Sequence, residues 1–213
     1  MKKYTMNPIN LTIDTQNLDG SFKRIAEDLL NQFVLISGEK SFRICEIEFY
    51  YTGVNHEDKY THGHELQKTS GMWYQHGSGL DITCGNENNY GGILIRALQE
   101  IDTEGKEVNY IYGPLKCLQA LMSGFRSIDK HEVIFGLERV PQGVMSHEEI
   151  YSAPRAGLNP DRQPEMHNKM YRYFIYPMKK HEPKGEIIAS LRDHIPDEKL
   201  KQVFGWKTLP EKK

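Results

Sequence analysis

The chain has few cysteines, no long apolar run and no surplus of basic charge. Its three cysteines are widely spaced and form no CxxC pair, which is typical of reduced thiols in a cytoplasmic protein. No apolar stretch approaches the roughly 18 residues of a membrane span, and the N-terminus lacks the apolar region of a secretory signal. A net charge of −2 argues against a strong, sequence-independent grip on duplex DNA, although 27 Lys and Arg residues leave room for a local basic patch.

The length of 213 residues, with 38% hydrophobic and 26% charged residues, is typical of one large globular domain. Apolar spacing predicts a helix that is capped by Asp19 or Ser21 and runs to about residue 30, and a second helix over 115–122. Strands are predicted, in chain order, over 32–37, 41–51, 80–84, 92–99, 132–139 and 171–176. Residues 52–80 are predicted to be irregular.

Strands outnumber helices and do not alternate with them as βαβ units. The predicted class is therefore α+β, with one domain around a curved, mostly antiparallel sheet. This domain is expected over residues 21–176, after an irregular segment over 1–20. Residues 177–213 are charged and polar, and they predict a peripheral extension with a helix over Asp197–Phe204.

The strand over 43–50, RICEIEFY, has one apolar face and one acidic face. Because side chains alternate along a strand, its core face is expected to carry Cys45, Ile47 and Phe49. The opposite face then carries Glu46, Glu48 and Tyr50. Two explanations for these acids stay open: the face is exposed to solvent, or its carboxylates belong to a site.

A series of short motifs, which includes part of this strand, runs along the chain in a fixed order. They are RIAEDLLNQFVL, ICEIEFY, DKYTH, GMW, LDIT, GILIRALQ, GPLKCLQAL, GLER, SAPRAGL and YRYFI. In this order the motifs resemble those of the alkyladenine (3-methyladenine) DNA glycosylase family, over roughly residues 21–176. The resemblance implies the fold of that family. It also implies hydrolysis of the N-glycosidic bond of a damaged base, the first step of base excision repair, without a cofactor.

The resemblance also assigns roles to residues. It aligns Glu48 with the catalytic glutamate that activates water, and Arg96 with an active-site arginine. Tyr50 and His62 align with residues that stack on the extruded base. DNA or a single-stranded nucleic acid is the implied partner.

Two departures from the family pattern affect these expectations. Only residues 74–79 occupy the interval in which the family carries a second stacking tyrosine and a hairpin that wedges into the duplex. Trp73 or Tyr74 could replace the tyrosine, but flipping from intact duplex is expected to be less favourable without a wedge. Asp81 stands where the family has an asparagine, and an ionised carboxylate cannot donate the hydrogen bond that an amide can.

Two other functions remain open. The histidines at 56, 62, 64 and 76 could form a metal site, since imidazole suits borderline metals. Alternatively, the missing wedge, Asp81 and the acidic charge balance fit a catalytically inactive binding module with a glycosylase-like fold. Arg96, in a buried strand, is as compatible with a structural ion pair as with catalysis.

Overall fold

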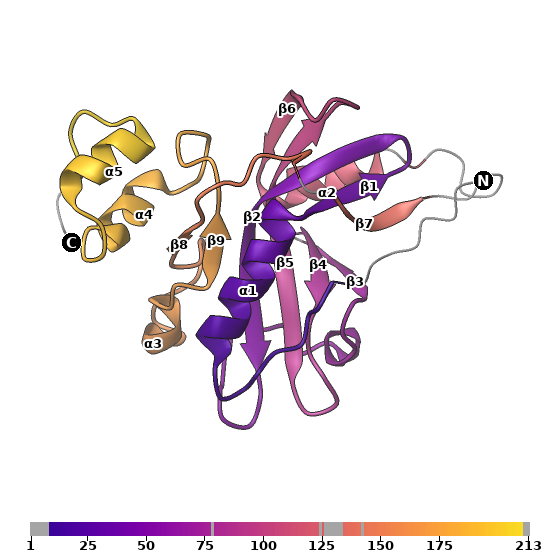
Figure 1. The fold of residues 1–213 in the computed structure, drawn as a ribbon. Coiled ribbons are helices and arrows are strands. Elements are labelled where there is room, and N and C mark those ends of the chain that lie inside the picture. Colours follow the sequence, from indigo (N-terminus) through magenta and orange to yellow (C-terminus); the bar gives the residue numbers. More distant parts are fainter. Residues whose placement is uncertain (1–8, 78, 124, 126–133, 142, 211–213) are drawn as a thin grey trace.

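A computed structural model of the protein describes residues 9–77, 79–123, 125, 134–141 and 143–210. These residues form an α+β fold around one curved antiparallel sheet (Figure 1), which confirms the predicted class. Its strands are β1 (Phe33–Ser37), β2 (Lys40–Thr52), β3 (Trp73–His76), β4 (Gly79–Thr83), β5 (Tyr90–Ile101), β6 (Glu107–Tyr112), β7 (Phe135–Arg139), β8 (Tyr151–Ala153) and β9 (Arg172–Phe174).

The main path across the sheet runs β3-β4-β5-β2-β1-β7. Strand β6 pairs with β5, and the short pair β8-β9 joins the sheet through β9, which pairs with β2. The long strand β2 therefore has β5, β1 and β9 as neighbours along its length. It is the central element of the molecule.

The helices are α1 (Leu18–Asn31), α2 (Pro114–Met122), α3 (Pro164–His167), α4 (Lys184–Leu191) and α5 (Asp197–Phe204), with a 3-10 helix, η1, over Glu65–Lys68. The N-cap of α1 is Asn17, whose side chain accepts a hydrogen bond from the backbone of Gly20. The predicted caps Asp19 and Ser21 were therefore wrong by two to four residues. Asn17 is the N-cap because its side-chain oxygen accepts a hydrogen bond from a backbone N–H of the first turn, which has no partner within the helix.

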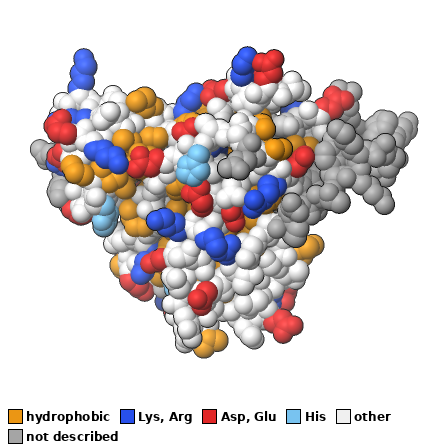
Figure 2. Space-filling model, viewed as in Figure 1, with side chains coloured by type: hydrophobic (Ala, Val, Ile, Leu, Met, Phe, Trp, Pro, Cys, Tyr) orange, Lys and Arg blue, Asp and Glu red, His pale blue; other side chains and the backbone are white. Residues whose placement is uncertain are grey.

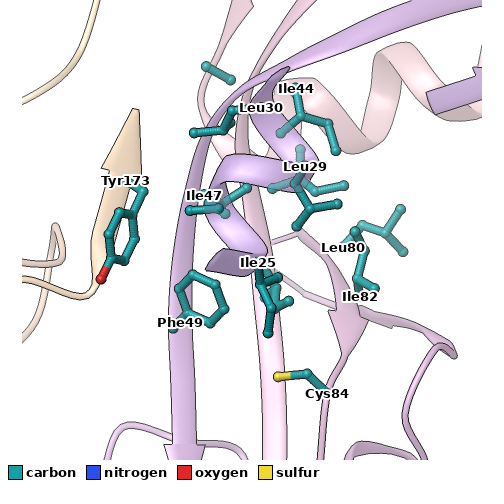
Figure 3. Close-up of a cluster of buried hydrophobic side chains, with 14 of the residues drawn as sticks. Ile25, Leu29, Leu30, Ile44, Ile47, Phe49, Leu80, Ile82, Cys84 and Tyr173 are labelled. Carbon is teal, nitrogen blue, oxygen red and sulfur yellow. The ribbon is translucent and has the colours of Figure 1, made fainter. Parts of the chain in front are cut away.

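The core lies between α1 and the sheet. Ile25 and Leu29 of α1 point toward Ile47 and Phe49 of β2 (Figure 3), and all four side chains are completely buried. Phe22 adds a stacked ring contact with Phe49 at 4.4 Å between ring centroids. The apolar face predicted for the strand over 43–50 is thus confirmed as core.

Several elements differ from their prediction. The stretch 52–80 is not irregular throughout, because it contains η1 and β3. Strands β6 and β8 and helices α3 and α4 follow from no sequence pattern identified above. The predicted strand over 132–139 is present from residue 135 as β7, and its first two residues lie outside the described part of the chain.

The C-terminal segment after residue 176 has a core of its own. Ile188 of α4 and Leu200 and Phe204 of α5 pack on Tyr151 of β8 and Phe174 of β9. Figure 1 shows these helices beside the β8-β9 pair, at the far side of the molecule from β3. The helix predicted over Asp197–Phe204 is confirmed. Within the described ranges, no helix is both long and apolar enough to cross a membrane.

Candidate active site

A row of side chains crosses four strands of the sheet at the same level. In the strand register, Glu48 on β2 lies opposite Leu94 on β5, which lies opposite Asp81 on β4, which lies opposite Tyr74 on β3. Cross-strand partners point to the same face of a sheet. The fold therefore brings residues that are far apart in sequence to one face, and Glu48 and Asp81 lie two strands apart on it.

Glu48 is completely buried, so the solvent-face explanation for the acidic side of β2 is wrong. Its Oε1 accepts a hydrogen bond from the backbone N–H of Ala156 at 2.7 Å, and its Oε2 accepts one from the Tyr50 hydroxyl at 2.7 Å. Arg96 lies at 3.3 Å from Oε1 through Nε and at 3.4 Å from Oε2 through Nη1. A carboxylate offers about four acceptor positions. The Ala156 N–H, the Tyr50 hydroxyl and Arg96 Nη1 each donate to one of them, whereas Arg96 Nε donates its one hydrogen to Glu46.

Glu46 is also completely buried, two residues before Glu48. Its Oε1 lies 2.8 Å from Arg96 Nε and 2.9 Å from Arg172 Nε, and its Oε2 contacts Nδ1 of His181. Burial opposes ionisation of Glu46, but Arg172, His181 and Arg96 outweigh it and lower its pKa to about 2. Glu46 is an ionised centre that holds Arg96, Arg172 and His181 in place.

Arg96 joins the two glutamates. Burial alone would lower the pKa of Arg96, but Glu48 and Glu46 more than compensate, so the guanidinium stays charged. Its Nη2 lies 3.4 Å from the Tyr112 hydroxyl on β6. Arg96 therefore takes part in a structural ion pair with Glu46 and also contacts the proposed catalytic glutamate.

A cavity of about 150 Å³ lies next to this charged group. It is lined by Tyr50, Tyr60, His62, Gln67, His76, Asp81, Leu94 and Leu158. Pockets for drug-sized ligands measure about 300–1,000 Å³, so this cavity suits a fragment such as a single nucleobase. Three predicted residues, Tyr50, His62 and Asp81, are brought together here. Glu48 contacts the cavity through the Tyr50 hydroxyl.

Tyr50 links the cavity to Glu48 and is held from behind. Burial and the neighbouring Glu48 carboxylate hold the pKa of Tyr50 well above its ordinary value, so its hydroxyl stays protonated and donates. The Arg155 guanidinium lies 4.6 Å from the centre of the Tyr50 ring. Arg155 is fixed by Asp58 through contacts of 2.6 and 3.1 Å, in a pair with no solvent exposure. The ring that lines the cavity thus has a rigid support.

Asp81 supplies the charged part of the cavity wall. Its Oδ1 lies 3.0 Å from Nε2 of His76, and its Oδ2 lies 3.5 Å from the Gln67 amide nitrogen. Asp81 is 2% exposed. Asp81 and Gln67 can lie this close to β5 because residue 92 is a glycine. A Cβ there would lie 2.5 Å from Asp81 Oδ2 and 2.7 Å from Gln67 Nε2.

His62 lies on the cavity beside two other rings. Its ring meets that of His76 edge-on at 4.4 Å and that of Tyr74 edge-on at 6.0 Å. Burial, and to a smaller extent the neighbouring His76, lower the pKa of His62, so its ring is neutral at physiological pH. A neutral imidazole is suited to stacking on a base.

The two candidates for the missing tyrosine lie in different places. Trp73 packs against Phe135 at 4.8 Å between ring centroids, among the residues that surround the main core. Trp73 does not line the cavity, because alternation along β3 turns it away from the face that carries Tyr74 and Asp81. Tyr74 does not line the cavity but stacks on His64 at 4.7 Å and contacts His62.

Several residues of the site were missed by sequence reasoning. Tyr60, Gln67 and His76 line the cavity from the stretch 52–80, which offers no helix or strand pattern that would orient them. Arg172 carried a signal, since an arginine between Tyr171 and Tyr173 in an apolar strand requires a buried carboxylate. His181, completely buried, lies in a segment whose charged composition indicates a surface tail.

The histidines near the cavity do not form a chelating group. Across the described ranges, no set of three or more His, Cys, Asp or Glu side chains is placed to hold a metal ion. His76 is engaged with Asp81, and His64 accepts a hydrogen bond from the backbone of Leu66 as the cap of η1. The geometry of these histidines favours a role in the cavity wall and in local capping.

The interval that the family fills with a wedge hairpin is very short. Strands β3 and β4 pair directly, with His76 opposite Gly79, so only residues 77 and 78 connect them. Figure 2 shows basic and acidic side chains interspersed on the face of the molecule in view, without a continuous basic stripe. The short connection agrees with the short interval in the sequence, and the mixed surface charge agrees with the net charge of −2.

Comparison with known proteins finds a similar viral protein. An uncharacterized protein of Acanthamoeba polyphaga mimivirus is 30% identical over 190 residues, which cover 73% of this chain and 86% of the viral protein. The chain belongs to the family of that viral protein. No family model matches the chain. The resemblance to DNA glycosylases therefore rests on the motifs alone.

Proposed function

We propose that the protein is an N-glycosidic bond hydrolase of the 3-methyladenine DNA glycosylase type. The observation that carries the proposal is a base-sized cavity, lined by Tyr50, His62 and Asp81, whose tyrosine hydroxyl binds the buried carboxylate of Glu48. An aromatic ring, a neutral imidazole and a carboxylate are the groups that a nucleobase requires for stacking and for hydrogen bonding along its edge.

In the proposed reaction, Glu48 takes a proton from a water molecule whose oxygen bonds to C1′ of the sugar. The bond between C1′ and the base nitrogen breaks, and its electron pair leaves with the base. The transition state is oxocarbenium-like, and carboxylates serve the same purpose in glycoside hydrolases. Arg96, at 3.3 and 3.4 Å, makes the longest contacts of Glu48. We propose that the attacking water binds the carboxylate beside Arg96, whose guanidinium orients it.

The substrate is expected to be an unpaired or already extruded nucleotide. The two-residue connection between β3 and β4 cannot provide a wedge that compensates for unstacking a paired base, which costs a few kcal/mol. The net charge of −2 also disfavours many phosphate contacts. We therefore propose single-stranded or damaged DNA as partner, and a role in base excision repair.

A second candidate function is a binding module without catalysis. It is favoured by the surroundings of Glu48, which is completely buried and already accepts hydrogen bonds from Tyr50, Ala156 and Arg96. In that case the cavity binds a free base or a nucleoside, and Glu48 serves only to hold Tyr50, Arg96 and the loop at Ala156.

Base release distinguishes the two functions. Single-stranded and duplex DNA carrying alkylated or deaminated bases are incubated with the wild type and with Glu48→Gln, and the released base is measured. The expected result is release from single strands by the wild type and a loss of at least about 100-fold in Glu48→Gln. Thermal unfolding of both proteins shows that they are folded.

Each other outcome has a definite meaning. No release from any substrate by the folded wild type contradicts the hydrolase, and binding of the free bases by calorimetry would then support the binding module. Release that survives Glu48→Gln assigns the general base to another residue. We also propose a cytoplasmic location, which the three buried free thiols support.

A further inference from the structure

His181 belongs to the C-terminal segment but lies inside the charged group around Glu46. Its side chain is completely buried, with its ring 4.7 Å from that of Phe174. Nδ1 contacts the Glu46 carboxylate, and Nε2 lies 3.1 Å from the carbonyl oxygen of Tyr176. The extension predicted to be peripheral thus sends one side chain into the centre of the molecule.

Both nitrogens of His181 face acceptors. A carbonyl oxygen has no hydrogen to donate, and the Glu46 carboxylate is ionised beside Arg96 and Arg172 at 2.8 and 2.9 Å. A neutral imidazole would place a bare nitrogen against one of these two acceptors. The Tyr110 hydroxyl, at 3.5 Å from Nε2, is directed instead to the carbonyl of Lys180. This arrangement requires a hydrogen on each ring nitrogen.

The same segment holds Arg96 from its other side. The Tyr112 hydroxyl, at 3.4 Å from Arg96 Nη2, accepts a hydrogen bond from the backbone N–H of Glu182 at 2.7 Å. His181 therefore holds Arg96 through Glu46, and the backbone of Glu182 holds it through Tyr112. Arg96 is the side chain that is proposed to orient the water at Glu48.

We propose that His181 is a positioning residue: doubly protonated, it holds Glu46 and thereby fixes the Arg96 guanidinium against Glu48. The C-terminal segment then completes the active site. The consequence for base release rests on the proposed function, whereas the protonation of His181 and its hold on Arg96 do not. Placement errors near 1 Å can cost about 100-fold in rate, which sets the scale of the expected effect.

The first test is nitrogen NMR of the full chain at pH 7.5, with labelled histidine and arginine. His181 is identified by nuclear Overhauser contacts to the Phe174 ring, so no variant is needed. The expected result is a hydrogen on both ring nitrogens. A single protonated nitrogen overturns the proposal. This measurement is informative even if the wild type releases no base.

The second test compares His181→Asn, His181→Leu and His194→Asn. Asparagine keeps a donor toward Glu46 without the charge, leucine removes both, and His194 is an exposed histidine of the same segment that serves as control. In His181→Asn, kcat for base release is expected to fall by about 10- to 100-fold with KM within about twofold. The fall should be larger in His181→Leu and absent in His194→Asn.

An unchanged kcat in folded His181→Leu overturns the positioning role. If the wild type releases no base, the side-chain Nε–H signal of Arg96 provides the readout instead. Its chemical shift and its hydrogen exchange are expected to change in His181→Asn and to stay the same in His194→Asn. An Arg96 signal that does not respond to His181→Asn contradicts the proposal independently of any activity.

Discussion

The Tyr50 hydroxyl donates a hydrogen bond of 2.7 Å to Oε2 of Glu48, two residues earlier on the same face of β2. This bond connects the cavity wall to the buried carboxylate. In Tyr50→Phe the ring remains but the donor is lost, so Glu48 is left with an unpaired buried lone pair, which costs about 1–3 kcal/mol. We expect the free energy of unfolding, measured with denaturant, to fall by about that amount, with binding of a free base nearly unchanged.

Tyr50→Ala provides the comparison for this prediction. It removes the ring as well as the hydroxyl, and it takes away the partner of the Arg155 guanidinium at 4.6 Å. Base binding, measured by calorimetry, should fall by at least about tenfold in Tyr50→Ala only, since stacking on an aromatic ring contributes about 1–3 kcal/mol per base. Equal binding losses in the two variants would show that the hydroxyl, and not the ring, recognises the base.

Gly92→Ala should close part of the cavity. The added Cβ would lie 2.5 Å from Asp81 Oδ2 and 2.7 Å from Gln67 Nε2, and Asp81 is held by His76, so the acidic wall must shift. We expect base binding to weaken by about tenfold or more, as is usual when a well-placed polar contact is lost. Gly185→Ala in α4 is the control, because a Cβ there meets nothing within 4 Å. Wild-type affinity in Gly92→Ala would place the base elsewhere.

The buried pair of Asp58 and Arg155 should contribute strongly to stability. Both side chains have no exposure, and removing one partner leaves an uncompensated charge. Asp58→Asn is expected to lower the free energy of unfolding by about 3–5 kcal/mol. Glu104→Gln, which breaks an equally short but exposed pair with Lys106, should change it by less than about 1 kcal/mol. Similar losses in both variants would contradict this account.

Glu46 makes stability depend on pH in the acidic range. Its pKa is about 2 in the folded protein against an ordinary value of 4.5, so the folded state favours the ionised form. The stabilisation is fully present above about pH 4.5 and is lost as the pH falls toward 2, with a total of roughly 3 kcal/mol. Urea unfolding at a series of pH values between 7 and 2.5 measures this loss.

Glu46→Gln tests the origin of that dependence. The variant should be less stable than the wild type by about 3–5 kcal/mol at pH 7, because Arg96, Arg172 and His181 lose their shared carboxylate. The gap between the two proteins should narrow below pH 4.5, where the wild type begins to lose the same charge. A constant gap down to pH 2.5 would assign the acid sensitivity to other groups.

Much of the fold could be predicted because the main elements carry strong periodic patterns. The alternation in β2 and the helical spacing in α1 follow directly from burial on one side. Strand β6 (EVNYIY) could not be predicted from pattern, since its first three residues are exposed and none of its residues is fully buried. It is a strand because β5 pairs with it. Helix α4 was missed because the surrounding charged composition indicates a surface tail.

The site could be predicted only in part. Glu48, Tyr50 and Asp81 were singled out because the motifs that contain them resemble those of the glycosylase family, and they lie on strands, where the alternation fixes the direction of a side chain. Tyr60 and His76 were not, since their positions depend on how the stretch 52–80 folds against the sheet. The role of Glu46 could not be predicted for another reason. Its partners Arg172 and His181 lie more than 120 residues later in the sequence, and no local pattern connects them to Glu46.

The charged group around Glu46 also has a consequence for how the protein is made. Its members come from positions 46, 48, 96, 172 and 181, so a chain growing from its N-terminus has both glutamates and Arg96 long before it has Arg172 and His181. A partly synthesised chain can form the helix α1 and its contacts with β2, but it has no full set of countercharges for Glu46. The candidate active site is therefore among the last parts of the molecule to form during translation.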